Sequence, residues 1–542
     1  MRGPVPTPGA QTPELVELAD QLTPAPPPGE LTELSAGELA RLIRARTVTS
    51  REVLEAHLAR AAVTEPRVHG VVAWRQTDAR EAADAADARI AAADPFEELP
   101  PLLGVPCTVK ESLALAGMPH TAGFLPARGV RRSSAQNAPA VDQLLRAGAI
   151  PVGVTNTSEL CLWIESRNKV YGDSRNPYDV RRTVGGSSGG EGAVIGSGGV
   201  PFGVGSDLAG SIRVPAFCCG IFGHKPSVGV VSTSGHFPMD PGPSRRMMVV
   251  GPLARRAGDL LPLLQILDSE DPSDPFNRRS SLGDPSTVRL AGMPVVLPDG
   301  LGVTTGVSPE LLEARERAAA ALAAQGARIV RMKSRALVKA QLIFIEALRS
   351  SWNDEFVDSI GWEARRVREL YRGLASEDGA HTAAFVNLAA GVALAGKVRR
   401  PSPPETFRRA IANITAEIEA EIGGGVMLLP PMPRPAPPHG WTTLRPWAMG
   451  TMVPANLFGW PATQIPMGIG REGLPIGVQA MAPMDQDHRT IAVALELERA
   501  FGGWVPPEQA GALRPVVRPT ERRKVRARVR EAASRARANR RS

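Results

Sequence analysis

The chain has 542 residues, a formal net charge of +8 and four cysteines. This length can bury a large core. The lack of a C-x-x-C pair argues against a structural zinc site, and the lack of a long apolar run argues against a transmembrane anchor. The charge is uneven: residues 514–542 hold 12 basic and two acidic side chains, so the rest of the chain has no general basic field for nucleic acid.

The N-terminal residues 1–29 are rich in proline and lack the apolar core of a signal peptide. We expect a loosely ordered arm with a short helix at residues 13–22. Few, apolar-flanked cysteines indicate buried thiols in a reducing compartment, so a cytoplasmic location is expected. After the arm, the capping boxes Ser35-x-x-Glu38 and Thr49-x-x-Glu52 each predict the start of a helix.

A lysine follows the apolar stretch that begins at Gly104. Only seven of the 63 cationic residues are lysine, so most positions that need only a positive charge hold arginine. Arginine cannot lose its proton in a protein, whereas a buried lysine can become neutral. Lys110 is therefore a candidate general base. The alternative is that Lys110 only ends a strand and pairs with Glu111.

Residues 137–154 predict a helix followed by a strand. Asn137 can cap the helix, which closes near Gly148. The apolar run Ile150–Val154 then predicts a buried strand.

Two serines lie in glycine-rich backbone 24 positions apart, Ser187 in the run Gly185–Gly190 and Ser211 in the run Ser206–Arg213. Glycine lets the backbone bend sharply and approach a ligand closely. Exposed backbone N–H groups can stabilise the oxyanion that forms when a serine attacks a carbonyl. The pattern indicates a serine nucleophile if a base is available, although the same composition is typical of linkers.

The C-terminal half alternates between strands and helices. Strands are predicted at residues 294–297, 328–330, 462–469 and 475–481, and helices at residues 308–326 and 487–501. Residues 335–399 predict further helices, whereas the proline-containing segments 268–286 and 430–438 predict loops. This alternation indicates an α/β protein, with a sheet covered by helices on both faces.

Together the motifs resemble the amidase signature family. The match rests on Lys110, the double-serine glycine run and the run Asp207-x-x-Gly-Ser-Ile-Arg213. Within the family, the segment from Gly104 to Val231 is most similar to the type 2 branch of fatty-acid amide hydrolases. The cues to this branch are the runs Thr155–Cys161, Tyr171–Asp179 and Ile221–Ser227.

The resemblance implies an α/β fold with a mixed central β-sheet sandwiched between α-helices. We accordingly divide the chain into the arm, a catalytic domain at residues 30–505 and a basic tail at residues 506–542. The tail composition is typical of a disordered, solvated segment. The resemblance implies no metal and no cofactor.

The resemblance also implies a role for each motif residue. Ser211 is the nucleophile, Ser187 the bridging serine and Lys110 the base. The remaining implied site residues fall into three groups: an oxyanion hole from the backbone N–H groups of Leu208, Ala209, Gly210 and Ser211; supporting residues Ser188, Ser206, Asp207 and Arg213; and a substrate pocket at Cys161, Leu162 and Trp163. For Cys161, a small core side chain is the alternative.

Two positions depart from the family pattern. Ala209 stands where many members have glycine, which implies an ordinary φ there. Glu111-Ser112 replaces the usual acidic residue and asparagine, which can alter the support of the lysine. Asp207 and Arg213 flank the nucleophile and are expected to form a charge pair that fixes the oxyanion loop.

The implied activity is hydrolysis of apolar carboxylic or fatty-acid amides to an acid plus ammonia or an amine, through an acyl-enzyme. The expected partner is a small-molecule amide, with a homodimer left open and no nucleic acid expected. One alternative is a nucleophile elbow, G-x-S-x-G, with Ser188 as nucleophile. The others are a glutaminase (A-type) subunit of a tRNA-dependent amidotransferase and a nucleic-acid-binding protein that acts through its basic tail.

Overall fold

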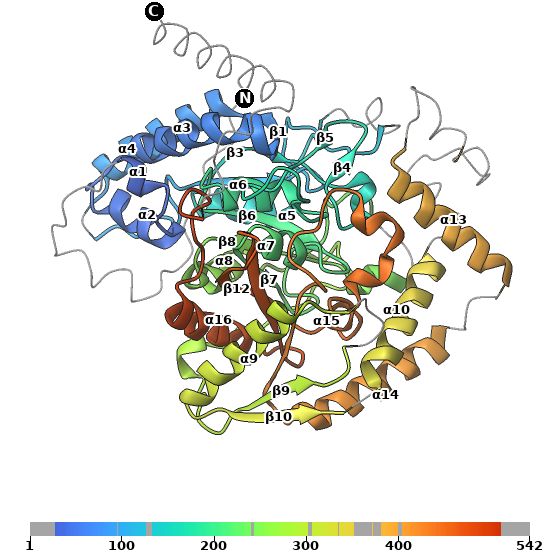
Figure 1. The fold of residues 1–542 in the computed structure, drawn as a ribbon. Helices are drawn as coiled ribbons and strands as arrows, with labels where there is room; N and C mark the ends of the chain where they lie inside the picture. The colour runs from blue at the N-terminus through green and yellow to red at the C-terminus, as the bar shows by residue number, and fades with distance from the viewer. Residues whose placement is uncertain are drawn as a thin grey trace, which may run out of the picture.

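A mixed β-sheet forms the centre of the molecule (Figure 1). The computed structural model describes residues 28–510 apart from 95, 126–132, 240–242, 302–305, 334, 352–370, 372–380 and 399–403. The sheet has 11 strands in the order β1-β3-β2-β6-β8-β7-β12-β13-β11-β9-β10. The predicted helix at residues 13–22 and most of the predicted tail at 506–542 lie outside the described residues.

Strand direction makes this sheet mixed, as predicted. β2 is parallel to β3 and β6, and β9 is parallel to β10 and β11. The other neighbouring pairs in the sheet are antiparallel. The strand bounds are β1 Val71–Trp74, β2 Pro106–Lys110, β3 Ile150–Thr155, β6 Phe202–Asp207, β7 Phe222–Lys225, β8 Val249–Ala254, β9 Pro294–Pro298, β10 Arg328–Met332, β11 Val426–Leu429, β12 Ala462–Ile469 and β13 Pro475–Met481. A separate small sheet pairs β4 Arg167–Asn168 with β5 Gly172–Asp173.

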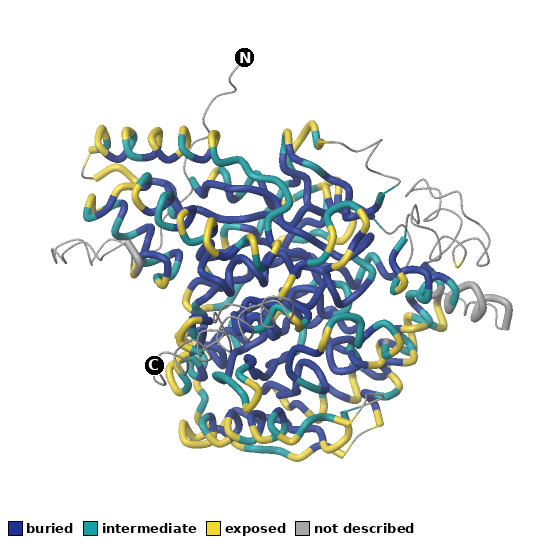
Figure 2. The backbone as a smooth tube through the Cα atoms, turned by 45° about the horizontal axis from the view of Figure 1, so that its top comes forward, coloured by how far each residue is buried: buried dark blue, intermediate teal, exposed yellow. Residues whose placement is uncertain are grey.

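Helices cover both faces of the sheet. Successive side chains of a strand point to opposite faces, so each strand contributes to the core on both sides. In β9, Val295 belongs to a core cluster shared with α9, whereas Val296 belongs to a cluster shared with α10 and α14. Buried backbone fills the centre in Figure 2, and exposed positions follow the outer helices. The helix bounds are α1 Pro28–Leu31, α2 Ala36–Arg44, α3 Ser50–Val68, α4 Gln76–Ala92, α5 Pro139–Arg146, α6 Gly189–Gly196, α7 Arg213–Cys218, α8 Leu260–Leu267, α9 Pro309–Ala324, α10 Ala336–Ser351, α13 Ala383–Val398, α14 Pro404–Ile422, α15 Val453–Leu457 and α16 Asp487–Phe501.

Several predicted boundaries are confirmed. Ser35 and Thr49 each form a complete capping box, at the starts of α2 and α3. The predicted strands at 462–469 and 475–481 are β12 and β13, and the predicted helix at 487–501 is α16. Most of the described part of residues 335–399 is helical, in α10 and α13.

The predicted cap at Asn137 is wrong. α5 begins after Ala138 and has no side-chain cap. The Asn137 side chain instead accepts from the N–H of Ala116 at 2.7 Å and donates to Asp142 at 2.8 Å. The Asn137 side-chain oxygen therefore bonds to a residue 21 positions away instead of capping the helix.

The parallel pair β2 and β6 positions the site. Val109 in β2 lies opposite Val204 in β6, and the two strands end at Lys110 and Asp207. The carboxyl ends of parallel strands meet at one edge of a sheet, where α/β proteins place their ligands. The fold therefore brings the lysine motif beside the second serine motif. None of the described helices is long and apolar enough to cross a bilayer.

Candidate active site

Lys110 ends β2 with its side chain completely buried. Its Nζ lies 2.6 Å from Ser187 Oγ and 2.9 Å from Ser206 Oγ. Burial disfavours the charged amine and holds the pKa of Lys110 below its ordinary value. The structure thus joins a lysine that can become neutral to the predicted bridging serine.

The carboxyl group that follows Lys110 in the sequence does not pair with it. Glu111 Oε1 accepts from the N–H and hydroxyl of Thr121 at 2.6 and 2.7 Å and from the Tyr171 hydroxyl at 2.8 Å. Burial raises the pKa of Glu111 to about 7. Lys110 does end a strand, but no ion pair joins it to Glu111 in the described structure, so the predicted pairing with Glu111 is wrong.

The double-serine run separates two hydroxyls that are adjacent in sequence. The peptide bond Gly186–Ser187 is cis, and Ser187 lines a pocket. Ser188 is fully buried, and its hydroxyl donates to the carbonyl oxygen of Ser206 at 3.3 Å. A nucleophile elbow needs an accessible serine directly after a strand. Neither condition holds at Ser188, so the elbow interpretation is wrong.

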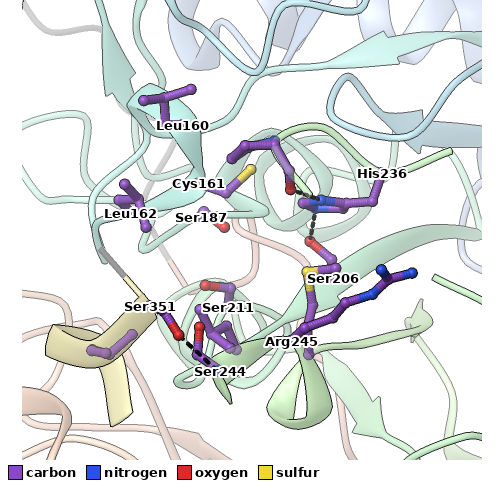
Figure 3. Close-up of a pocket in the computed structure, with 14 residues that line it drawn as sticks. Leu160, Cys161, Leu162, Ser187, Ser206, Ser211, His236, Ser244, Arg245 and Ser351 are labelled. Carbon is purple, nitrogen blue, oxygen red and sulfur yellow. Dashed lines mark hydrogen bonds between the residues drawn. The ribbon is translucent and has the colours of Figure 1, made fainter. Parts of the chain in front are cut away.

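Ser211 lies in the turn between β6 and α7. Its side chain is 6% exposed and lines the same pocket as Ser187 (Figure 3). The two serine motifs are tied by backbone, since the N–H of Ser188 donates to the carbonyl of Ser211 at 3.1 Å. In the described structure no hydrogen bond joins the hydroxyls of Ser211 and Ser187. Catalytic contacts often tighten only with substrate bound, and proton transfer from Ser211 to Ser187 stays a prediction.

Three of the four predicted oxyanion N–H groups have no hydrogen-bond acceptor in the part of the chain that the structure describes. Within the described residues, the N–H groups of Leu208, Ala209 and Ser211 enter no hydrogen bond. The N–H of Gly210 differs, because it donates to Asp207 Oδ1 at 2.7 Å. Gly210 has a φ of +108°, which glycine tolerates, whereas Ala209 has no left-handed φ, as expected. The prediction is therefore corrected at Gly210, whose N–H is held by a carboxylate.

A buried ion pair holds this turn in place. Arg213 Nε and Nη2 donate to the two carboxylate oxygens of Asp207 at 3.0 and 3.1 Å, and both side chains are fully buried. Burial opposes ionisation, but Arg213 holds the pKa of Asp207 well below its ordinary value. The expected charge pair is present. Arg213 does not line the pocket, so its position argues against direct contact with substrate.

Removing one partner of this pair is expected to destabilise the fold strongly. Arg213→Leu leaves the Asp207 carboxylate buried without its counter-charge, which costs about 3–5 kcal/mol of unfolding free energy. Thermal denaturation measures the effect. Arg181→Leu is the control, since it breaks an ion pair with Asp179 whose arginine side chain is 80% exposed, and little change is expected. Equal shifts in the two variants contradict a structural role for Arg213.

A largely apolar pocket opens beside Ser187 and Ser211. Its apolar lining consists of Leu160, Cys161, Leu162, Leu208, Pro238, Met248 and Leu348. Cys161 and Leu162 were predicted here. Trp163 was also predicted but does not line the pocket. It lies buried with its indole Nε1 donating to Thr442 Oγ1 at 2.8 Å, a partner that its own sequence neighbourhood does not reveal.

The pocket also contains residues that the sequence did not identify. His236 comes from the loop after β7, Ser244 and Arg245 from the segment before β8, and Ser351 from the end of α10. The N–H of Ser244 donates to Ser351 Oγ at 2.8 Å, which ties α10 to the pocket. No motif marks these positions, because only the tertiary fold brings them to the serines.

Cys161 is the one cysteine that lines the pocket. Its Sγ lies 3.3 Å from Thr157 Oγ1. Burial disfavours the thiolate, but the adjacent Lys110 and His236 lower the pKa of Cys161 to about 5. The charge effects require protonated Lys110 and His236, and they weaken when either group becomes neutral. The interpretation of Cys161 as only a core side chain is therefore insufficient.

Iodoacetamide is expected to alkylate Cys161 well before the other cysteines. The other three are fully buried, and burial raises their pKa, so their thiolates are scarce. Peptide mapping after brief treatment identifies the labelled residue, and Cys161→Ala should remove the early label. Comparable early labelling of Cys107, Cys218 or Cys219 contradicts this expectation.

The site as a whole supplies the groups that acyl transfer requires. A serine hydroxyl faces a pocket, a second hydroxyl contacts a buried amine, and free backbone N–H groups lie at the turn. Within the described ranges, no group of three or more His, Cys, Asp or Glu side chains is arranged to hold a metal ion. The mixed-sheet fold and the cluster of two serines and a lysine are together typical of a hydrolytic enzyme.

Comparison with known proteins identifies the family. The family model described as Amidase matches residues 52–491, so the chain belongs to the amidase family and is an amide-hydrolysing enzyme. It is 38% identical over 491 residues to Fatty-acid amide hydrolase 2-A of Danio rerio, covering 88% of this chain and 90% of that protein. It is 35% identical over 501 residues to Fatty-acid amide hydrolase 2 of Homo sapiens, covering 90% and 92%.

A solved structure of the family supports the predicted fold class. The peptide amidase from Stenotrophomonas maltophilia superposes with a TM-score of 0.70 at 23% identity, covering 88% of this chain and 99% of that one. The predicted α/β fold, with a mixed sheet between helices, is confirmed. The predicted resemblance to the type 2 branch is confirmed as well.

Proposed function

We propose that this protein hydrolyses amides of apolar carboxylic acids through an acyl-enzyme on Ser211. The observation that carries the proposal is the 2.6 Å contact between Lys110 Nζ and Ser187 Oγ, next to a pocket that Ser211 lines. Similarity to proteins named fatty-acid amide hydrolase 2 supports the substrate class.

Acylation begins when neutral Lys110 accepts the Ser187 hydroxyl proton while Ser187 accepts the proton of Ser211. The Ser211 oxygen then attacks the amide carbonyl carbon. The oxyanion accepts hydrogen bonds from the N–H groups of Leu208, Ala209 and Ser211, which need no reorganisation because they are already unoccupied.

Collapse of this intermediate needs a proton on the leaving nitrogen, since an amide anion leaves very poorly. Protonated Lys110 returns its proton through Ser187 to that nitrogen, the carbon–nitrogen bond breaks, and ammonia or an amine departs. Water then attacks the acyl-enzyme by the same proton route. The acid leaves, and Ser211 recovers its proton.

The lining of the pocket favours an apolar acyl group. Leucine and methionine side chains surround the space beside Ser211, among them Leu160, Leu162 and Met248. Transferring apolar surface from water into such surroundings is favourable. The reacting carbonyl faces the turn at Ser211, so the acyl chain contacts this lining.

For a series of saturated primary amides, kcat/KM is expected to rise about fourfold per added methylene, corresponding to about 0.8 kcal/mol per buried CH₂. The rise ends when the pocket is filled. Ammonia release measures the rates, and L-glutamine is the polar comparison. A higher kcat/KM for L-glutamine than for every apolar amide contradicts the proposed substrate class and favours the glutaminase alternative.

A further inference from the structure

His236 is connected to Lys110 through a single hydroxyl group. Its Nε2 lies 2.9 Å from Ser206 Oγ, and the same oxygen accepts from Lys110 Nζ at 2.9 Å. The other ring nitrogen, Nδ1, lies 2.9 Å from the carbonyl oxygen of Pro238. Figure 3 shows the imidazole of His236 hydrogen bonded to Ser206 at the side of the pocket. A continuous chain of hydrogen bonds therefore runs from a backbone carbonyl to the buried amine.

The carbonyl of Pro238 determines which nitrogen of the neutral imidazole carries hydrogen. A carbonyl oxygen only accepts, so Nδ1 is protonated and Nε2 presents its lone pair. The hydroxyl of Ser206 then donates to Nε2. A second hydroxyl, Ser112 Oγ, lies farther from the same nitrogen, at 3.2 Å. Because Ser206 donates its own hydrogen to His236, its hydroxyl oxygen can only accept a hydrogen bond from Lys110.

We propose that His236 is a positioning residue that, through Ser206, keeps the lone pair of neutral Lys110 free for Ser187. The inference rests on the proposed function, in which Lys110 accepts the Ser187 proton. A neutral amine has two hydrogens and one lone pair. If Ser206 donated to Lys110, it would occupy that lone pair and block the relay. Because His236 takes the Ser206 hydrogen, Lys110 donates to Ser206 and receives from Ser187.

Other ionisable groups surround the two ends of this chain. Cys161, Asp207 and Glu191 lie close enough to Lys110 to favour its charged form, and Cys161 also contacts His236. All of these groups remain in variants at position 236. Substitution of His236 removes both the acceptor for Ser206 and the neighbour of Cys161, and the Ser206→Ala background separates these two losses.

His236→Leu is expected to lower kcat about tenfold while KM changes less than about twofold, a part of the 10²–10⁴ contribution of general acid–base catalysis. The alkaline rise of kcat should also move to lower pH, because the released Ser206 hydroxyl stabilises the neutral amine. His236→Gln should restore most of the rate, since its amide oxygen accepts from Ser206. Rates are measured against pH with an apolar primary amide.

A double-variant comparison separates positioning from simple structural damage. In a Ser206→Ala background the link is already missing, so adding His236→Leu should change kcat less than about twofold. Ser112→Ala is the matched control, because it removes only the longer contact to the same nitrogen and should leave the pH profile in place. An equal loss from His236→Leu with and without Ser206, or no loss at all, overturns the proposal.

The wild-type protein offers a direct readout that needs no variant to fold. Nitrogen-15 NMR of histidine-labelled protein should show that the neutral form of His236 carries its hydrogen on Nδ1 and leaves Nε2 unprotonated. The opposite tautomer overturns the proposal. If the wild-type protein hydrolyses no amide, the proposed function fails; if it does and His236→Leu matches it in rate and pH profile, only the role of His236 fails.

Discussion

Replacing Ser211 with alanine is expected to lower kcat for an apolar primary amide by about 10⁴-fold or more, the loss typical when a serine nucleophile is removed. The expectation follows from position, since Ser211 lines the pocket beside three backbone N–H groups that have no acceptor among the described residues. Ammonia release under substrate saturation measures the loss.

The control for this experiment lies in the neighbouring motif. Ser188→Ala also removes a hydroxyl, but that hydroxyl is buried and bonded to a backbone carbonyl. Its effect on kcat should be far smaller than that of Ser211→Ala. The opposite ranking of the two variants contradicts the assignment of Ser211 and restores the elbow interpretation.

Lys110→Met is expected to lower kcat about 10³-fold and to remove the pH dependence, because a positioned base contributes 10²–10⁴. In the proposed mechanism, the neutral lysine is the active form. Burial lowers its pKa, so kcat/KM should rise with pH below the ordinary lysine range near ~10.4. Below that rise the lysine is protonated and activity is lost. The rise should be absent in Lys110→Met.

A second buried lysine provides the matched control. Lys225 is also fully buried, and desolvation lowers its pKa to about 7, yet it lies outside the pocket and donates to the carbonyl of Pro226. Lys225→Met should keep the rise of kcat/KM with pH. If the rise instead disappears in Lys225→Met and persists in Lys110→Met, the account of the base is wrong.

Local chemistry explains which elements the sequence predicts well. Capping boxes at Ser35 and Thr49 depend on residues three positions apart, and both form. β12 and β13 are apolar runs flanked by proline and glycine, so their bounds are readable directly. The cap at Asn137 fails for the complementary reason, since a distant backbone N–H competes for its side chain.

The same distinction applies to the candidate site. The short motifs identify Lys110, Ser187 and Ser211, and the fold brings them to one edge of the sheet. The hydrogen bond from the Gly210 N–H to Asp207 depends on the backbone conformation of the turn, which the motif alone does not specify.

Other residues that shape the pocket are not predictable in this way. His236 reaches the site through an isolated bridge to Leu113, and Ser351 reaches it from the end of α10. Both depend on how distant segments pack, and neither belongs to a motif. Trp163 is the opposite case. The motif predicts that it lines the pocket, but packing places its side chain in the core.

Covalent labelling is the direct test of whether Ser211 is the nucleophile. Wild type, Ser211→Ala, Ser188→Ala and Lys110→Met are treated with a fluorophosphonate, and adducts are read by intact-protein mass and peptide mapping. The expected result is one adduct, on Ser211, that is absent in Ser211→Ala, retained in Ser188→Ala and formed slowly in Lys110→Met. An adduct on Ser188, or an adduct that persists in Ser211→Ala, contradicts it.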